Sequence, residues 1–233
     1  MVCNNMQKNS HTKKRESKAD HISKLDLLTY EKDFLSKGKS VAGVDEAGRG
    51  PLAGPVVVAC VVMPIADKDI IKGVYDSKQL KPTEREILYE KIIKKAIEYN
   101  TSIIDNTTID KINILNATKK GMQDCINSLQ CKCDMVLIDA VKLSDTKIHT
   151  LPIIKGDTLS YNIAAASIIA KVTRDRIMVE YDALFPQYGF CRHKGYATPE
   201  HINALKTYGP CSLHRKSFIK NFFLEQTDLL TKF

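Results

Sequence analysis

The sequence predicts an α/β fold in which a mixed β-sheet is flanked by helices and is followed by a C-terminal helical region. Two short apolar runs rich in valine stand on either side of a glycine-rich turn, which is typical of a β-hairpin. Helical and strand-like patterns then alternate along the chain, as they do in sheets covered by helices. With 233 residues, of which 43% are hydrophobic, the chain has the length and composition of one globular domain.

Residues 1–38 are expected to form an N-terminal extension, and residues 39–233 the main domain with its C-terminal helical segment. The extension is polar and rich in lysine, asparagine and serine, so its first part is expected to be mobile. From about Ile22 onward the apolar spacing predicts a helix. A basic tail of this kind aids solubility, and a dedicated binding arm is the alternative.

The hairpin is predicted to comprise strands at 41–44 and 55–62. The first helix of the main domain is predicted from Pro82, because proline is typical of a first helical turn. Glu86 stands three residues after Thr83, as in a capping box. Apolar residues then recur at helical spacing. These positions are Ile87, Leu88, Ile92, Ala96 and Ile97.

The following elements alternate between strand and helix. A short strand is predicted near 102–104, and a helix over 109–129, where apolar residues recur on one side. The run at 135–138 is a candidate for a buried strand that ends at Asp139. A long helix is predicted over 159–181. Hairpin, helix and strand together indicate a sheet with both antiparallel and parallel pairs.

Composition and charge narrow the class of partner. The formal net charge is +8 and the pI about 9.0, which favours a polyanion such as nucleic acid or an acidic membrane surface. The longest apolar stretch, 163–170, is too short to span a membrane, and no apolar run follows the basic residues near the N-terminus. Seven cysteines without a C-x-x-C pair indicate reduced thiols and no structural zinc. A cytoplasmic monomer is expected.

Four carboxylates occupy positions where burial is predicted. Asp45 and Glu46 end the first apolar strand, and Asp139 ends another. Asp175 continues an apolar stripe of the long helix, so it is expected to face the packed side. Because an unpaired buried carboxylate is costly, such groups usually bind a cation or accept hydrogen bonds. Four of them converging would offer the oxygen ligands that Mg²⁺ or Mn²⁺ prefers.

Structural roles are the alternative for each acid taken alone. Asp175 could pair with Arg174 or Arg176, and Asp45 could cap the glycine turn. For all four acids together, this alternative is much weaker than a metal site. Two metal ions about 4 Å apart can activate water and stabilise the leaving oxygen in phosphodiester hydrolysis.

Two apparent nucleotide-binding motifs fail on their context. The segment 48–53 loosely fits G-x-G-x-x-A, but that motif must open a helix, and here Pro55 and a strand-like run follow. Gly38-Lys39-Ser40 lacks the earlier glycine of a P-loop. What remains is a turn whose glycines permit close approach of the backbone to a ligand.

An ordered set of segments resembles ribonuclease HII. The densest are VAGVDEAGRGPLAG at 41–54, DSKQL at 76–80, KGDTLSYNIAAASIIAKVTRDR at 155–176 and GYATPEH at 195–201. Shorter matches are Ile138-Asp139, Gly209-Pro210, His214-Arg215 and Ser217-Phe218. The likeness runs from about residue 39 to 220, and its order makes chance similarity a poor explanation. Arg49 in the glycine motif and the short extension favour this family over the sister family, ribonuclease HIII.

The resemblance implies an RNase H-like catalytic domain that hydrolyses RNA in RNA–DNA hybrids and cuts 5′ of ribonucleotides embedded in duplex DNA. It implies two Mg²⁺ or Mn²⁺ ions in the substrate complex and products with 3′-hydroxyl and 5′-phosphate ends. The metal-binding and catalytic acids of the family match Asp45, Glu46, Asp139 and Asp175. Its segment that senses the 2′-hydroxyl matches Gly48, Arg49 and Gly50, its junction tyrosine matches Tyr196, and its phosphate-contacting lysine matches Lys78.

The C-terminal segment suits contacts with a nucleic-acid backbone. Between 189 and 220 there are six lysines and arginines against one acid, Glu200, with Tyr196 and Tyr208 among them. Thr198 and Pro199 predict the start of a helix here. A solvated basic face, and for Tyr196 a half-buried aromatic, are the alternatives. The segments around 141–143, 158–159 and 211–212 depart from the family pattern, which leaves loop geometry and substrate preference open.

Two other functions compete with this interpretation. One is a different metal-dependent nuclease, such as a junction resolvase or an exonuclease, that shares only the acidic site. The other is a basic nucleic-acid-binding module whose acids are structural. A duplex with one embedded ribonucleotide separates the three functions, because only ribonuclease HII needs both the 2′-hydroxyl and the metal to cut it.

Overall fold

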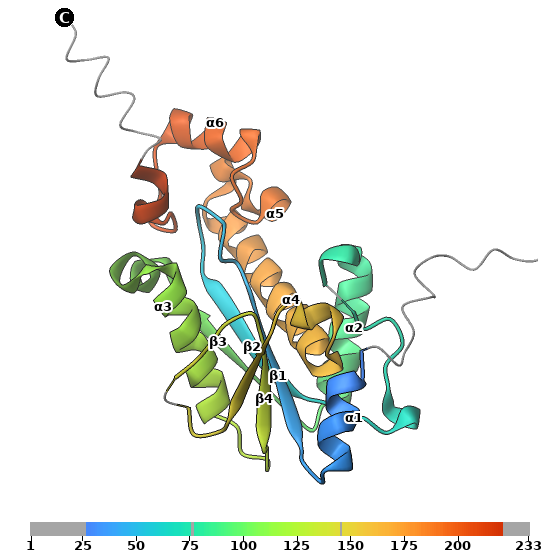
Figure 1. Cartoon of the computed structure of the whole chain (residues 1–233). Coiled ribbons are helices and arrows are strands. Elements are labelled where there is room, and N and C mark those ends of the chain that lie inside the picture. Colours follow the sequence, from blue (N-terminus) through green and yellow to red (C-terminus); the bar gives the residue numbers. More distant parts are fainter. Residues whose placement is uncertain (1–26, 76, 145, 221–233) are drawn as a thin grey trace, which may run out of the picture.

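The computed structural model describes residues 27–75, 77–144 and 146–220. One sheet is formed by β1 (Val41–Ala47), β2 (Val56–Val62), β3 (Glu98–Ile104), β4 (Met135–Asp139) and β5 (Thr150–Ile153). Its strand order is β3-β2-β1-β4-β5 (Figure 1). The pairs β1–β2 and β2–β3 are antiparallel, whereas β1–β4 and β4–β5 are parallel. The predicted hairpin and the mixed sheet are confirmed.

Helices cover both faces of the sheet. They are α1 (Thr29–Ser36), α2 (Pro82–Lys95), α3 (Asn106–Asn127), α4 (Tyr161–Leu184), α5 (Phe190–His193) and α6 (Pro199–Tyr208). On one face, Ala59 and Val61 of β2 pack in a core with α2 and α4. On the other, Val58 and Cys60 pack in a core with α3. Because successive strand residues point to opposite faces, both cores need the apolar, fully buried run of β2.

α4 lies directly against β1 (Figure 1). A Cβ atom at Gly43 would lie 2.1 Å from the backbone carbonyl carbon of Asn162, so only glycine permits this approach. The buried alanines of α4 keep its side facing the sheet narrow. As a result, the first half of α4 passes beside the end of β1, where the candidate site lies.

The C-terminal helical region is confirmed at the far end of α4, where α5 and α6 pack (Figure 1). Thr198 caps α6 as predicted, because its Oγ1 accepts a hydrogen bond of 3.2 Å from the His201 N–H. A cluster of buried hydrophobic residues joins this region to the glycine turn. These residues are Ala53, Met178, Tyr188, Phe190 and Ala204.

The described end of the N-terminal extension is packed into the main domain. Leu27 and Leu28 are buried in the core that contains α4. The fully buried Glu31 accepts hydrogen bonds through Oε1 from the Ser160 hydroxyl at 2.6 Å and from the Asn162 N–H at 3.0 Å. α1 therefore stabilises the beginning of α4. The predicted mobile segment and the predicted helix start at Ile22 lie outside the described residues.

Some element bounds differ from the prediction for identifiable reasons. α2 begins at Pro82 as predicted, but Glu84, not Glu86, accepts the capping hydrogen bond, 2.8 Å from the Lys81 N–H. β3 begins at Glu98, earlier than predicted. It is an edge strand in which polar residues alternate, so hydrophobicity gives little signal for its first residues. β5 was not predicted, because it has four residues, one of them Pro152, and also lies at an edge. No described helix is both long and apolar enough to cross a bilayer.

Candidate active site

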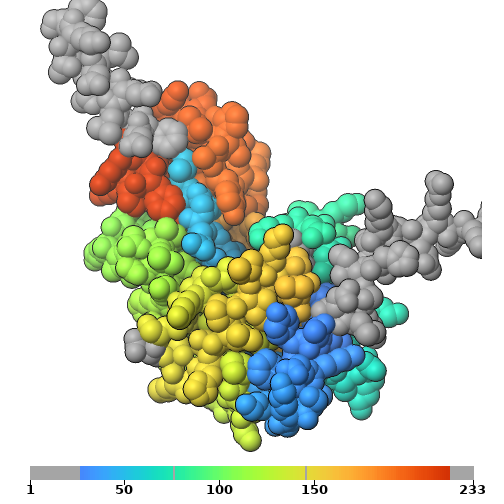
Figure 2. Space-filling view, in the orientation of Figure 1, coloured from blue at the N-terminus to red at the C-terminus, as the bar shows by residue number. Residues whose placement is uncertain are grey.

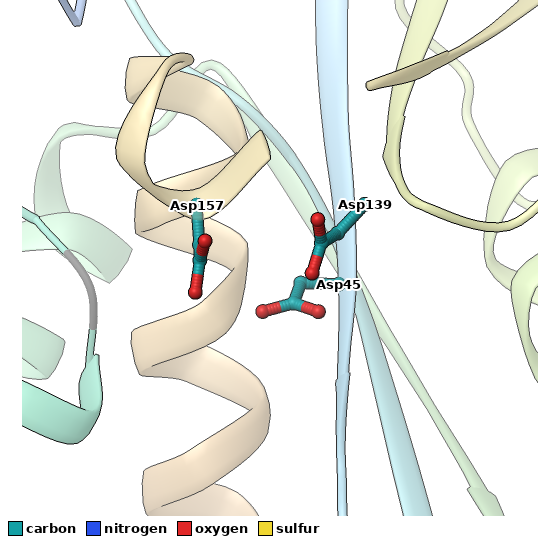
Figure 3. A group of neighbouring side chains, drawn as sticks. All are labelled: Asp45, Asp139 and Asp157. Carbon is teal, nitrogen blue, oxygen red and sulfur yellow. The ribbon is translucent and has the colours of Figure 1, made fainter. Parts of the chain in front are cut away.

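Three aspartates gather where the neighbouring strands β1 and β4 end. Asp45, Asp139 and Asp157 each offer a carboxylate oxygen, and these oxygens lie within 4.8 Å of one another. Asp45 and Asp139 come from the strands, and Asp157 comes from the short 3₁₀ turn η4 (Gly156–Thr158) that precedes α4. Figure 3 shows their carboxylates pointing toward one shared space. Three oxygen donors at this spacing form a candidate site for a hard divalent cation.

Strand register and one backbone hydrogen bond bring these groups together. Val44 of β1 lies opposite Ile138 of β4, so the parallel strands present Asp45 and Asp139 at the same edge of the sheet. The Gly156 N–H donates a 2.8 Å hydrogen bond to Asp139 Oδ1, which holds η4 against the end of β4. Asp157 is the next residue, so this contact fixes its distance from the strand acids.

Glu46 is the fourth acid at this end of the sheet, and it lines a pocket together with Asp45 and Asp139. Its Oε1 lies 3.4 Å from Arg49 Nη1, whereas its Oε2 is buried and has no hydrogen-bond partner among the described residues. Burial raises the pKa of Glu46, and the Arg49 charge opposes this shift. Burial, followed by the charges of Glu46 and Asp139, raises the pKa of Asp45 well above its ordinary value. Such a group of buried carboxylates fits a bound cation, which would supply the missing positive charge.

Asp175 does not join these carboxylates. Its Oδ1 accepts a 2.6 Å hydrogen bond from Lys171 Nζ, and its Oδ2 lies 3.8 Å from Arg85. The structure therefore does not bring Asp175 together with the other three predicted acids. Its ion-pair partners are Lys171 and Arg85, and not Arg174 or Arg176. Asp45 lies beside Ser167, and eight further residues carry the helix about 12 Å along its axis. The geometry places Asp157, not Asp175, with the strand-end acids.

Asp157 is the site residue that sequence reasoning missed. It lies inside the segment most similar to ribonuclease HII, directly after Lys155 and Gly156. A 3₁₀ turn gives no amphipathic repeat, so nothing in the apolar pattern indicates that this acid is buried. The available signal was its position in the family-like segment between a predicted strand and a predicted helix.

The predicted substrate residues line a pocket of about 220 Å³ together with Asp45, Glu46 and Asp139. Lys78 lies in the 3₁₀ turn η3 (Ser77–Gln79), with Nζ 3.6 Å from Asp157 Oδ2. Tyr196 is 42% exposed and stands beside the glycine turn. A Cβ atom at Gly50 would lie 4.0 Å from the Tyr196 ring. The structure thus brings the glycine turn, Lys78 and Tyr196 around the acids.

Two buried arginines hold the carbonyl groups of the glycine turn. Arg215 donates through Nη2 to the Gly48 carbonyl at 2.6 Å and through Nη1 to the Arg49 carbonyl at 2.9 Å. Arg174 donates through Nε to the Pro55 carbonyl at 2.9 Å. Both guanidinium groups are fully buried. Because these carbonyls are bound from within, the turn has a fixed shape before any ligand arrives.

A larger groove of about 740 Å³ adjoins the acidic pocket. The two share Lys171 and Tyr196, and the groove runs along α4 between α2 and the C-terminal region. Figure 2 shows the surface hollowed between these parts. Basic side chains predominate among the charged groups of its walls, and they are Arg85, Lys171, Arg176, Arg192 and Lys194. Its size and charge suit an extended polyanion.

Solved structures share this architecture. The ribonuclease H2 of Pyrococcus horikoshii OT3 has a TM-score of 0.68 and 28% identity, over 83% of this chain and 100% of the other. The RNase HII of Archaeoglobus fulgidus, solved in complex with PCNA, gives the same score and identity over 78% and 96%. The fold is therefore RNase H-like. Together with the acidic pocket, it defines a ribonuclease H-type hydrolase.

Sequence similarity identifies the family within this class. The family described as Ribonuclease HII matches residues 42–221. The ribonuclease HII of Ruminiclostridium cellulolyticum is 51% identical over 216 residues, which are 92% of this chain and 82% of that protein. That of Acetivibrio thermocellus is 53% identical over 202 residues, which are 86% and 78%. The chain belongs to the ribonuclease HII family, and it is a metal-dependent endoribonuclease that acts on RNA–DNA hybrids.

Proposed function

We propose that the chain also cuts duplex DNA on the 5′ side of an embedded ribonucleotide, using two Mg²⁺ or Mn²⁺ ions and leaving 3′-hydroxyl and 5′-phosphate ends. The observation that carries this proposal is the arrangement of Asp45, Asp139 and Asp157, whose oxygens lie within 4.8 Å of one another beside the glycine turn. A turn that can contact a sugar and a group that can bind cations thereby share one pocket.

The proposed metal ligands are Asp45, Glu46, Asp139 and Asp157. All four offer oxygen atoms only, which favours Mg²⁺ or Mn²⁺ over softer metals. The buried Oε2 of Glu46 supports this set, because it has no hydrogen-bond partner in the described ranges and a bound cation would satisfy it. When bound, such ions lower the pKa of water and stabilise the oxygen that leaves phosphorus. Asp157 takes the place that the sequence prediction gave to Asp175.

Substrate selection is assigned to the glycine turn and its neighbours. The 2′-hydroxyl is the group that distinguishes a ribonucleotide from its DNA neighbours. Gly48 and Gly50 have no side chains, so the backbone of the turn can approach that hydroxyl closely. Arg49 belongs to the same segment that we assign to sensing the 2′-hydroxyl. We assign Tyr196 to packing on the adjoining nucleotide and Lys78 to contacts with phosphates, because both line the pocket beside the turn. Fixing the scissile phosphate among these groups lowers the entropic barrier to hydrolysis.

Asp175 has a positioning role in this proposal. Arg85, beside Asp175, donates hydrogen bonds to the carbonyl of Ser77 at 3.0 Å and to the carbonyl of Leu80 at 2.6 Å. These carbonyls flank Lys78. Asp175 thus acts through Arg85 on the turn that carries Lys78, and it also holds Lys171 at the edge of the pocket.

The test is cleavage of a DNA duplex that contains one ribonucleotide. We expect a single cut on its 5′ side with Mg²⁺ or Mn²⁺, no cut with EDTA, and no cut of the matched all-DNA duplex. Asp45→Asn should nearly abolish cleavage while the thermal unfolding curve stays cooperative. Cleavage of the all-DNA duplex would instead indicate a general nuclease, and chelator-insensitive binding without cleavage would indicate a binding module. Activity of Asp45→Asn at the wild-type level would end the metal-site proposal.

The monomeric state, the cytoplasmic location and the domain boundary at residue 38 stay predictions. Sedimentation of the purified protein at several concentrations would test the first of them.

A further inference from the structure

Three buried histidines fill the space between the C-terminal helical region and the glycine turn. His201 is fully buried, and His214 and His193 nearly so. The rings of His193 and His201 are stacked with centroids 4.5 Å apart, and those of His201 and His214 lie 5.2 Å apart. Phe190 contacts all three rings. Buried imidazoles need hydrogen-bond partners for their ring nitrogens.

Hydrogen bonds determine which nitrogen carries the proton on each ring. The Cys211 N–H donates to His214 Nδ1 at 3.0 Å, so that nitrogen accepts and His214 Nε2 carries hydrogen. His214 Nε2 lies 3.0 Å from His201 Nε2, which must therefore accept. The remaining proton of His201 is on Nδ1, 2.9 Å from the Tyr196 carbonyl oxygen, to which it donates. A directed chain of hydrogen bonds thus runs from Cys211 to Tyr196.

Both rings are neutral in this arrangement. A further proton on His201 Nε2 would face the N–H group of His214 Nε2, and one on His214 Nδ1 would face the Cys211 N–H. Burial, followed by the neighbouring His201, lowers the pKa of His214 to about 4, and burial lowers the pKa of His201. The chain of hydrogen bonds is therefore intact at neutral pH.

The other side of His214 is bound to the glycine turn. His214 pairs with Ala53 in an antiparallel bridge, and the Arg215 N–H donates to the Leu52 carbonyl at 2.8 Å. The Leu52 N–H in turn donates to the Gly195 carbonyl at 2.8 Å, next to Tyr196. The turn and the tyrosine loop are thus linked directly at Leu52 and a second time through the histidine pair.

We propose that His201 and His214 are positioning residues that fix the Tyr196 ring opposite the glycine turn and thereby set the affinity for the RNA–DNA junction. This proposal rests on the substrate role given to Tyr196 above. Within the part of the chain that the structure describes, the Tyr196 carbonyl accepts two hydrogen bonds, one from His201 Nδ1 and one from the Thr198 N–H at 2.8 Å. Loss of the first lets the exposed ring move relative to Gly50, whereas Asp45, Glu46, Asp139 and Asp157 keep their contacts.

Paired substitutions separate the hydrogen bond from packing. In His201→Asn the side-chain amide nitrogen can occupy the place of Nδ1 and donate to the Tyr196 carbonyl. In His201→Gln the amide reaches the place of Nε2, facing His214, and the bond to Tyr196 is lost. Both variants remove aromatic contacts, so they should lose similar thermal stability. A hydrogen bond to a buried carbonyl corresponds to roughly a tenfold change in affinity.

The experiment measures kcat and KM on the singly substituted duplex, and binding of that duplex and of an RNA–DNA hybrid by fluorescence anisotropy in EDTA. We expect His201→Gln to raise KM and Kd roughly tenfold with little change in kcat. His201→Asn should stay within about threefold of wild type. In a Tyr196→Ala background the two substitutions should no longer differ, because the ring that they position is absent.

Substitutions of His214 provide a second test of the proposal if a His201 variant fails to fold. His214→Gln retains a group facing His201, whereas His214→Asn does not, so the second should be the weaker binder. Equal losses in both pairs, or full additivity with Tyr196→Ala, would overturn the positioning proposal. If wild type cuts the hybrid but not the singly substituted duplex, the proposed function fails instead. In that case, the affinities of the His201 and His214 variants for the RNA–DNA hybrid alone test the positioning proposal.

Discussion

The Gly156 N–H donates a hydrogen bond of 2.8 Å to Oδ1 of Asp139, and this contact joins the turn before α4 to the end of β4. A Cβ atom at Gly156 would lie 2.6 Å from Ile163 Cδ1, so the turn is also packed closely against α4. The turn that carries Asp157 is therefore held by β4 on one side and by α4 on the other. These backbone contacts hold Asp157 beside Asp139 in the cluster of carboxylates.

Asp157 and Asp175 should differ sharply when each is replaced by asparagine. Asp157→Asn removes a carboxylate from the metal-binding group, and we expect kcat to fall by roughly a hundredfold or more. Asp175→Asn leaves that group intact but weakens the contacts of Lys171 and Arg85, so it should mainly raise KM. Steady-state kinetics on the singly substituted duplex measures both effects. A greater loss of kcat in Asp175→Asn would restore the assignment made from the sequence.

Divalent cations should stabilise the folded protein through the same carboxylates. A ligand that binds only the native state raises the free energy of unfolding by RT ln(1 + [L]/Kd), which is about 3 kcal/mol at a hundredfold excess over Kd. Mg²⁺ or Mn²⁺ should therefore raise the thermal midpoint of wild type without substrate. Asp157→Asn should respond much less. Glu200→Gln, at an exposed acid that lines neither the acidic pocket nor the groove, is the matched control and should respond fully.

The strands and helices could be predicted where one face of the element is apolar. β2 is buried on both faces, and its unbroken run of valines with alanine and cysteine predicts a strand from the sequence alone. α4 is recognisable because its buried residues continue for several turns. β5 has four residues, Pro152 among them, at an edge of the sheet. Its pairing with β4 stabilises it, and that tertiary contact leaves no periodic signal in the sequence.

The acids of the site show which positions the apolar periodicity of the sequence can predict and which it cannot. Asp45, Glu46 and Asp139 end predicted strands, so their shared edge followed from the fold. For Asp175, the stripe along α4 gave the direction in which the side chain points, but the distance along the helix axis decides which groups it meets. Eight residues beyond Ser167, it meets Lys171 and Arg85 instead. Asp157 belongs to a turn, where position depends on contacts such as that of Gly156.

Arg215 should be indispensable to the shape of the glycine turn. Its guanidinium donates to the carbonyls of Gly48, Arg49, Gly54 and Pro55 at 2.6 to 3.1 Å. Lysine carries one nitrogen and cannot reach all four, so Arg215→Lys should lower the free energy of unfolding by about 3 kcal/mol. Urea denaturation measures this loss. Arg192→Lys, at an exposed arginine paired with Glu200, is the control and should change stability by less than about 1 kcal/mol.

Acid should destabilise the fold through His214. Burial lowers its folded-state pKa from an ordinary 6.5 to about 4, and the titratable groups that face it are His193, His201, Cys211 and Tyr188. Between these values the unfolded chain binds a proton that the folded chain does not. The stabilising contribution is therefore complete above pH 6.5 and is lost as the pH falls toward 4. From pH 7 to pH 4.5 the loss is about 2 kcal/mol.

Asp45, Glu46 and Glu31 act in the opposite direction, because their raised pKa values let the folded chain take up protons first. The comparison must therefore be made between wild type and His214→Gln, which share those acids. In urea denaturation, the stability advantage of wild type over the variant should shrink by about 2 kcal/mol between pH 7 and pH 4.5. An advantage that stays constant over this range would mean that His214 takes up its proton equally in the folded and the unfolded protein, so that burial does not lower its pKa.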